Sequence, residues 1–312
     1  MDWTPGGISS DLEDRRDDSG GGGGGFGLGG GGFGGGGGLG IVGFIIVLVI
    51  SLLTGHNFLG GLFSGGAASP DNSQSYNAPS SQYGPAVAGQ GNVSQHPAGE
   101  DRDVQLISWV LNDVQKTWTS IFAQSGQTYR HAKLVVYRNA TYSGCGTAQA
   151  STGPFYCPED QKVYIDLSFW NELKQFGGST ADFAQAYVVA HELGHHVQQL
   201  LGIEAREERA VSRDRSQRSP LSVDFELQAD CFAGVWAHST EQRGIVHHDD
   251  VSDALSAAAA VGDDHLQRMS GRAVSPETWT HGSSAQREHW FRAGLDGGTI
   301  QSCNTFNGQM AP

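Results

Sequence analysis

The sequence predicts an α+β domain, mainly helical with a small β-sheet, preceded by a disordered glycine-rich tail and one transmembrane helix. In the C-terminal two thirds, apolar residues repeat at steps of three and four over several long stretches, which is typical of amphipathic helices. Residues 133–137 and 163–167 are short apolar runs that predict strands. Glycine takes 46 of the 312 positions and is concentrated near the N-terminus, so the folded part is shorter than the chain.

The chain divides into four parts. Residues 1–38 are acidic and then glycine-rich, and such a tail buries too little apolar surface to fold. Residues 39–63 contain no Asp, Glu, Lys or Arg and are long enough for one transmembrane helix, with cleavage at residues 67–69 as the alternative. Residues 64–100 are rich in Ser, Gly, Pro, Gln and Asn and predict a flexible spacer. The folded domain is therefore expected within residues 101–312.

Basic residues set the expected orientation of this span. Arg15 and Arg16 precede it, and no Lys or Arg follows it before Arg102. The positive-inside rule then predicts a single-pass protein of the cell membrane, with a cytoplasmic N-terminus and a periplasmic or extracellular domain. The net charge of −14 argues against a nucleic-acid partner, because an acidic chain gains little from counterion release on phosphates.

Five helical stretches are expected in the domain. They are residues 104–121, 181–201, 224–240, 251–267 and 284–295. Residues 203–222 are highly charged and contain Ser219-Pro220, so we expect a polar excursion there.

The second of these helices carries the motif His191-Glu192-Leu-Gly-His195. Residues four apart share one face of a helix, so His191 and His195 can offer two imidazole nitrogens to one ion. Glu192 is one residue further on and can reach a water at the metal rather than the metal itself. The motif indicates a Zn²⁺ site, and the alternative is a helix with solvated surface histidines.

A catalytic zinc site needs a third protein ligand and one open position. Glu226 is the expected ligand, because it lies in an apolar helical stretch with Asp230 one turn further on. Asp230 is expected to accept a hydrogen bond from the free ring nitrogen of a zinc-bound histidine. The acidic residues that remain as alternatives to Glu226 are Asp224, Glu204, Glu207 and Glu208.

Four cysteines allow three disulfide connectivities. Cys145–Cys157 is favoured because it closes a short loop, and Cys231–Cys303 is then the remaining pair. Cys231 as a metal ligand is the less favoured alternative, because it turns away from the face of Glu226.

Several runs of the sequence resemble a bacterial family of neutral zinc metallopeptidases. These runs are residues 153–158 (GPFYCP), 163–166 (VYID), 191–198 (HELGHHVQ), 226–231 (ELQADC) and 281–287 (HGSSAQR), with Trp3 and residues 13–16 (EDRR) near the N-terminus. The resemblance covers nearly the whole chain and matches residues 203–222 only loosely. It implies a gluzincin-like, zincin-type hydrolase with His191, His195 and Glu226 as zinc ligands, and little about the substrate.

The expected function is that of a membrane-anchored zinc metallopeptidase acting on a peptide or protein. Glu192 is the expected general base, and His281 the expected second electrophile for the oxyanion. Tyr156 and Tyr164 are alternatives to His281. Residues 163–167 are expected to form an edge strand that aligns the substrate.

Two other functions are compatible with the sequence. A cell-wall peptide amidase would use the same residues. A non-catalytic, membrane-tethered binding or scaffold protein would hold zinc for stability, usually through four protein ligands, and the sequence offers no obvious fourth. Nothing in the sequence indicates the oligomeric state.

Overall fold

The computed structural model describes residues 1–18, 96–97, 99–149 and 152–306. The predicted transmembrane helix and nearly all of the predicted spacer lie outside these residues. Within the described part of the chain, no helix combines the length and the apolar character needed to cross a membrane.

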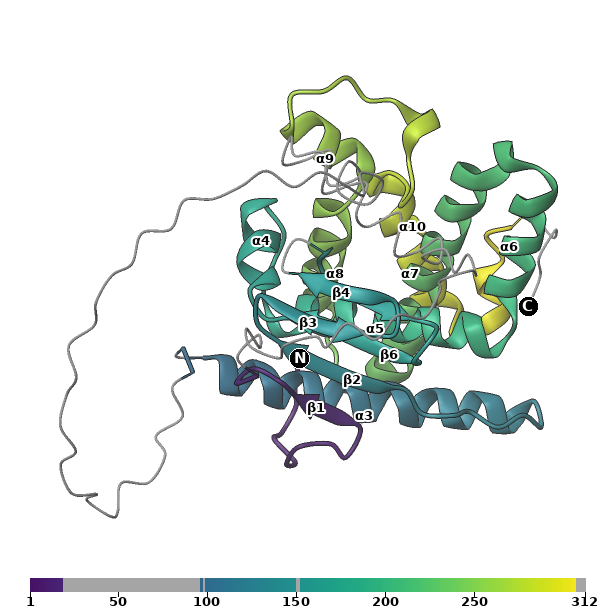
Figure 1. Ribbon diagram of the computed structural model, residues 1–312. Coiled ribbons are helices and arrows are strands. Elements are labelled where there is room, and N and C mark those ends of the chain that lie inside the picture. The colour runs from purple at the N-terminus through teal and green to yellow at the C-terminus, as the bar shows by residue number, and fades with distance from the viewer. Residues whose placement is uncertain (19–95, 98, 150–151, 307–312) are drawn as a thin grey trace, which may run out of the picture.

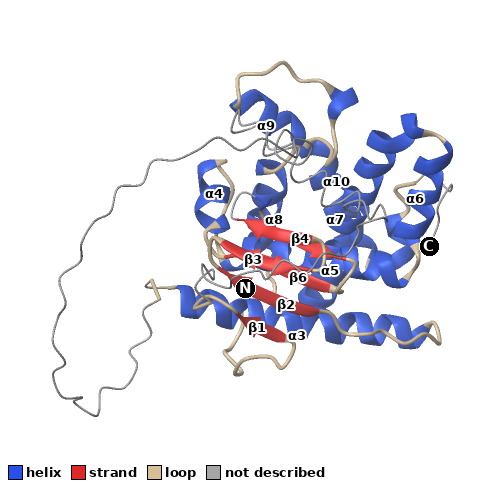
Figure 2. Cartoon of the chain, viewed as in Figure 1, coloured by secondary structure: helices blue, strands red, loops and turns tan. Residues whose placement is uncertain are grey.

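Four strands form one mixed sheet (Figures 1 and 2). In spatial order they are β1 (Leu12–Asp14), β2 (Lys133–Tyr137), β6 (Lys162–Asp166) and β5 (Phe155–Cys157). The first three are parallel, and β5 is antiparallel to β6. Both predicted strands are present, but the expectation that residues 163–167 lie at the edge is wrong. β6 is flanked on both sides, because the short run at residues 155–157 pairs beyond it.

The two faces of the sheet bury different side chains, since successive residues of a strand point to opposite sides. The residues on the face that joins the main helical core are Leu134, Val136, Val163 and Ile165. The residues on the other face are Val135, Tyr137 and Tyr164. That second face is covered by a hairpin of β3 (Ala140–Ser143) and β4 (Gly146–Gln149), whose Ala148 is buried there.

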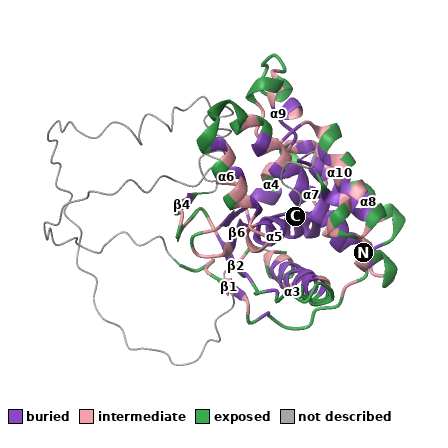
Figure 3. Ribbon diagram, turned by 90° about the vertical axis from the view of Figure 1, so that its right-hand side faces the viewer, coloured by how far each residue is buried: buried purple, intermediate pink, exposed green. Residues whose placement is uncertain are grey.

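Helices make up most of the described domain, which confirms the mainly helical α+β prediction. They are α3 (Glu100–Gln124), α4 (Phe169–Gln175), α5 (Asp182–Leu200), α6 (Ile203–Arg213), α7 (Arg218–Gln242), α8 (His248–Ala260), α9 (Asp263–Met269) and α10 (Ser284–Gly297). Helix α5 packs against α3, α7, α8 and β5. Residues 183–198 of α5 are all buried, as Figure 3 shows in purple. The HExxH motif therefore lies on the innermost helix.

The segment 203–222 is polar, as predicted, but it is also helical, which was not predicted: it contains α6 and the start of α7. Ile203, Glu207 and Val211 recur at intervals of four and are the buried residues of α6. Two apolar residues on so charged a helix give only a weak apolar stripe. The helix is stabilised by packing against α5 and α7 rather than by an apolar face of its own.

The predicted helix at residues 251–267 is divided into α8 and α9. Gly262 is extended between them, with φ −68° and ψ 139°. The carboxylates of Asp263 and Asp264 begin the second helix and accept backbone N–H groups from residues 280–284. The break therefore turns two acidic side chains toward the connection that precedes α10.

Residues 1–18, predicted as part of the disordered tail, are ordered against the domain. Strand β1 pairs with β2, and Leu12 is buried in the main core. The acidic residues that suggested disorder have basic partners far along the chain, such as Lys133 for Asp11 and Lys162 for Glu13. These pairings explain why composition alone gives the wrong result for this segment.

Both favoured disulfides are formed. Cys145–Cys157 joins the turn of the β3–β4 hairpin to β5. Cys231–Cys303 joins α7 to the short 3₁₀ helix η4 (Ile300–Cys303). Cys231 is therefore committed to a disulfide and does not serve as a metal ligand in this fold.

Candidate metal centre

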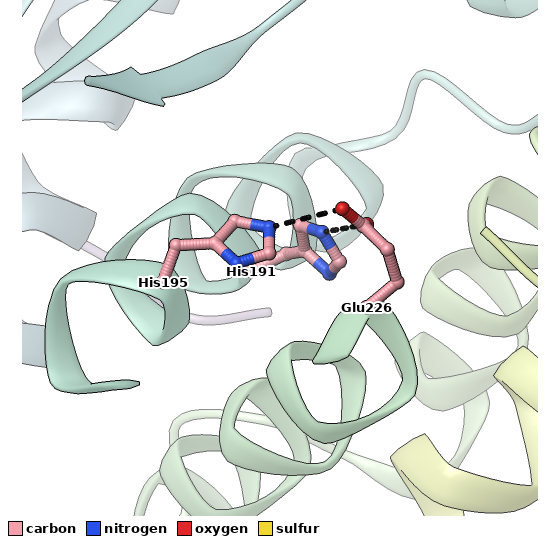
Figure 4. A group of neighbouring side chains, drawn as sticks. All are labelled: His191, His195 and Glu226. Atoms are coloured by element: carbon pink, nitrogen blue, oxygen red, sulfur yellow. Dashed lines mark ion pairs between the residues drawn. The ribbon is translucent and has the colours of Figure 1, made fainter. Parts of the chain in front are cut away.

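Three predicted ligands come together between α5 and α7 (Figure 4). The Nε2 atom of His191 lies 3.3 Å from Glu226 Oε2, and the Nε2 atom of His195 lies 3.6 Å from Glu226 Oε1. All three side chains are buried. Of the acidic alternatives, none joins this group within the described residues.

The spacing of these donor atoms fits zinc. A tetrahedral zinc ion about 2.0–2.2 Å from its nitrogen and oxygen ligands separates those ligands by roughly 3.3–3.6 Å. The separations of 3.3 and 3.6 Å, to the two oxygens of Glu226, are of this size, and one donor atom from each of the three residues lies within 4.8 Å of the others. Two imidazoles and one carboxylate are also a donor set typical of zinc sites with an open fourth position.

Hydrogen bonds at the far side of each ring leave the Nε2 atoms available. His191 Nδ1 lies 2.8 Å from Asp230 Oδ1, and His195 Nδ1 lies 2.8 Å from Gln198 Oε1. The Gln198 amide is itself oriented, because its Nε2 donates to the backbone oxygen of Phe225 at 2.7 Å. Both acceptors hold a proton on Nδ1, which directs the lone pair of each Nε2 toward the shared centre.

The role predicted for Asp230 as hydrogen-bond acceptor of His191 is confirmed, and it belongs to a larger buried network. Arg287 on α10 donates to Asp230 from Nε and Nη2, both at 2.8 Å. The hydroxyl of Tyr187 donates to Asp230 Oδ1 at 2.5 Å and accepts from Arg287 Nη2 at 3.2 Å. A buried carboxylate thus has three protein donors around it, which stabilises its charge and fixes its position.

Tyr187 and Arg287 also belong to the site, although neither was predicted from the sequence. Tyr187 is four residues before His191 on α5, so its place on the ligand face could have been found from helical spacing. Arg287 is 57 residues from Asp230, and no local pattern indicates that a guanidinium at this position is buried. Only its place in the run 281–287 set it apart.

Gly194, between the two histidines, allows the two ligand-bearing helices to approach each other. A Cβ atom at this position would lie 3.1 Å from Ala229 O and 3.2 Å from Ala229 Cα on α7. Backbone contacts that close cannot be relieved by moving a side chain. The glycine therefore brings α7, and with it Glu226, within reach of His191 and His195.

The protonation states of the site follow from burial and neighbouring charge. Burial lowers the pKa of His195 to about 4, so this imidazole is neutral. Burial also opposes protonation of His191, but the charge of Asp230 and the hydrogen bonds to Asp230 and Glu226 together outweigh it and raise the pKa to about 10. For Glu226, burial favours the neutral acid, yet the surrounding His195, His281 and His191 hold the pKa well below its usual value. A metal ion and a proton therefore compete for His191 Nε2 beside a charged carboxylate.

Glu192 lies next to this group on α5 and is 7% exposed. Burial, with a smaller effect from the charge of Glu226, raises the pKa of Glu192 to about 7. The imidazole of His281 is within electrostatic range of both Glu192 and Glu226. Burial disfavours its charged form, but Glu226 and Asp263 together raise the pKa of His281.

Asp263 holds the His281 segment in place. Its Oδ2 accepts the backbone N–H groups of Thr280, His281 and Gly282 at 2.8, 2.6 and 3.0 Å. His281 Nδ1 lies 3.5 Å from Asp263 Oδ1 and 3.0 Å from the hydroxyl of Thr280. His281 is thus near the three ligands but is not one of them.

The two tyrosines named as alternatives to His281 are engaged elsewhere. The hydroxyl of Tyr156 bonds to His196 Nδ1 at 2.8 Å and to Gln199 Oε1. His196 Nε2 in turn bonds to the backbone oxygen of Arg130 at 2.6 Å, so this buried histidine is structural. The hydroxyl of Tyr164 donates to Asp160 at 2.6 Å on the opposite face of the sheet.

Comparisons with known proteins identify the family of the chain. The profile of the family described as "putative neutral zinc metallopeptidase" matches residues 1–306. The uncharacterized protein YpfJ of Escherichia coli K12 is 48% identical over 225 residues, which cover 72% of this chain and 78% of YpfJ. The uncharacterized protein Rv2575 of Mycobacterium tuberculosis is 42% identical over 207 residues, covering 63% of this chain and 68% of Rv2575. No solved structure matches. The chain belongs to this zinc metallopeptidase family.

Proposed function

We propose that the protein is a zinc metallopeptidase, attached to the cell membrane through its apolar residues 39–63, that hydrolyses peptide bonds. Family membership supports a peptidase, and the apolar stretch of the sequence supports membrane attachment. The single observation that carries the proposal is the convergence of two Nε2 atoms and one carboxylate at 3.3 and 3.6 Å. In this proposal His191, His195 and Glu226 are the zinc ligands.

Three protein ligands favour catalysis over a structural role. Structural zinc is almost always held by four protein ligands, whereas catalytic zinc keeps one position open. The group found within the described residues has three members. Zinc bound there supplies a Lewis acid that polarises a carbonyl and makes a water more acidic. The scaffold alternative is accordingly the weaker one.

Glu192 is the proposed general base. It follows His191 directly on α5, and its side chain is nearly as buried as those of the ligands. From this position its carboxylate accepts a proton as water attacks the amide carbonyl and then delivers a proton to the leaving amine.

His281 is the proposed electrophile that stabilises the oxyanion. Asp263 fixes its backbone and lies beside its Nδ1 atom, so Nε2 is the ring atom that remains for a substrate oxygen. Because Asp263 and Glu226 favour the imidazolium form, the group brings positive charge to the site.

Strand β5 replaces residues 163–167 as the proposed substrate-aligning edge. It pairs with β6 on one side, and within the described residues no strand pairs with its other side. The hydroxyl of Tyr156 ties β5 to α5 through His196 and Gln199. An extended peptide added to this edge would run beside the helix that carries the HExxH motif.

The test uses the full chain purified from membranes in detergent, with metal analysis and a library of peptides that includes cell-wall peptides. Glu192→Gln is compared with Glu207→Gln, a matched variant of another buried glutamate outside the ligand group. We expect about one zinc per chain in all three proteins, with cleavage lost only in Glu192→Gln. Tight zinc without cleavage by the wild type would favour the scaffold function, and cleavage confined to cell-wall peptides would favour the amidase.

A further inference from the structure

The N-terminal 18 residues pack on the domain and contribute strand β1 (Leu12–Asp14) to its sheet. Leu12, Glu13 and Asp14 stand in parallel register with Leu134, Val135 and Val136. Leu134 N donates to Asp11 O and Arg15 N donates to Val136 O, both at 2.8 Å. Figure 1 shows β1, in purple, alongside β2 and next to the long helix α3. The segment completes one edge of the sheet.

Contacts continue through the residues before β1. The N-terminal ammonium group lies 2.5 Å from Asp250 at the start of α8. Trp3 Nε1 donates to Asp182 at the start of α5 at 2.7 Å. Ser9 is buried, and its backbone N–H donates to the hydroxyl of Ser108 on α3 at 2.7 Å. This segment therefore joins three helices as well as the sheet.

The two arginines used to orient the predicted span are paired to the domain itself. Arg15 Nη1 donates to the backbone oxygen of Tyr142 at 3.2 Å. Arg16 Nη1 donates to Asp101 at 2.9 Å. Their positive charge serves contacts with the folded domain, so it does not by itself indicate a cytoplasmic N-terminus.

The described chain stops and resumes at neighbouring points. His96 Nε2 lies 2.9 Å from Asp17, and His96 Nδ1 lies 3.1 Å from Asp101. Asp17 is one residue from the end of the first described segment, and His96 begins the next. The end of the first described segment and the start of the next therefore lie close together, beside the start of α3.

These contacts are incompatible with a single membrane crossing between residues 18 and 96. One crossing would separate residues 1–18 from the domain by a hydrocarbon layer about 30 Å thick. The same argument excludes pairing with the tail of a second copy, which would lie on the far side as well. We propose that the N-terminus and the domain lie on the same side of the membrane, with residues 1–18 docked on β2 in the membrane-bound protein.

The first test measures the side on which each part lies. Ser10→Cys, in the tail, and Ser120→Cys, on α3, place single thiols at exposed positions of the full chain. All four native cysteines are in disulfides and do not react. A membrane-impermeant maleimide is applied to intact and to lysed cells. We expect both variants to behave alike, either both labelled in intact cells or both only after lysis. Labelling of one variant alone in intact cells would overturn the proposal.

The second test measures docking. Asp11 and Lys133 directly precede the paired residues Leu12 and Leu134 on adjacent strands, and Asp11 O accepts the N–H of Leu134 at 2.8 Å. Thiols at positions 11 and 133 are therefore within reach of each other. The double variant Asp11→Cys/Lys133→Cys is oxidised in isolated membranes, with each single variant as control. We expect a linked pair of peptides by mass spectrometry in the double variant alone. Absence of this link would overturn the proposal even if both positions prove to lie on one side.

Discussion

Replacing Asp230 by asparagine tests how the buried network supports the metal centre. The carboxylate of Asp230 is fully buried and accepts hydrogen bonds from His191, Tyr187 and Arg287. Asparagine has the same size but no charge, and its amide nitrogen cannot accept a hydrogen bond. The Asp230→Asn variant therefore leaves the 4%-exposed Arg287 without its counter-charge and His191 with a weaker acceptor.

Two separate losses follow from this change. Removing one partner of a buried ion pair destabilises a protein by about 3–5 kcal/mol. Weakening the group that orients a metal-bound histidine lowers metal affinity by about 10–100-fold, which corresponds to about 1.4–2.8 kcal/mol of binding free energy. We expect both effects in Asp230→Asn, so the variant unfolds more easily and its folded fraction binds zinc more weakly.

Asp113→Asn is the matched control. Asp113 accepts two hydrogen bonds at 2.7 Å from Arg243 and one at 2.9 Å from Trp236, but it is not bonded to a metal-ligand candidate. Both variants are measured by thermal unfolding and by zinc titration against a competing chelator. Asp113→Asn should lose stability and keep its zinc affinity. Equal zinc affinity in the two variants would refute the assigned role of Asp230.

Three further outcomes are expected. Burial raises the pKa of Glu207 to about 8, so unfolding releases a proton between about pH 4.5 and 8 and the free energy of unfolding falls as the pH rises through this range. Glu207→Gln should flatten this pH dependence in thermal melts at several pH values. An unchanged slope in the variant would contradict a neutral, buried Glu207. A Cβ atom at Gly294 would lie 1.9 Å from Cys231 O, so Gly294→Ala should lower the free energy of unfolding by at least about 1–3 kcal/mol in denaturant. A variant as stable as the wild type would show that α7 and α10 are not this close. A chelator should lower the melting temperature of the wild type but not that of Glu226→Gln, whereas an equal response would remove Glu226 from the ligand set.

Elements with a strong internal period were predictable from the sequence. Residues 104–121 repeat an apolar side chain at steps of three and four, and the structure has a helix over Glu100–Gln124. Helix α6 was not predictable in this way, because its buried face holds Ile203, Glu207 and Val211 among charged residues. Its position depends on packing against α5 and α7, and a local pattern carries no information about distant surfaces.

Some residues of the site were likewise predictable from local spacing, and others depend on how the helices pack. His191 and His195 are related by helical spacing, and Asp230 follows from Glu226 by the same rule, so the sequence places each pair on one face. Spacing alone did not predict that α5 and α7 lie side by side. That prediction came from the donor chemistry of zinc, which requires a third protein ligand from outside the HExxH motif. Arg287 satisfies no spacing rule and no ligand requirement. Its place in the site depends on the packing of α10 against α7.

The N-terminal segment shows how a sound composition rule can give the wrong result. Acidic residues beside a long glycine run predict disorder when their partners are sought nearby in the sequence. Glu13 pairs with Lys162, 149 residues away, as well as with the nearby Arg15, and Asp11 pairs with Lys133. The positive-inside rule likewise counts Arg16 without regard to its contact with Asp101 in the folded protein. Rules of this kind hold for segments that remain apart from the fold, and residues 1–18 belong to it.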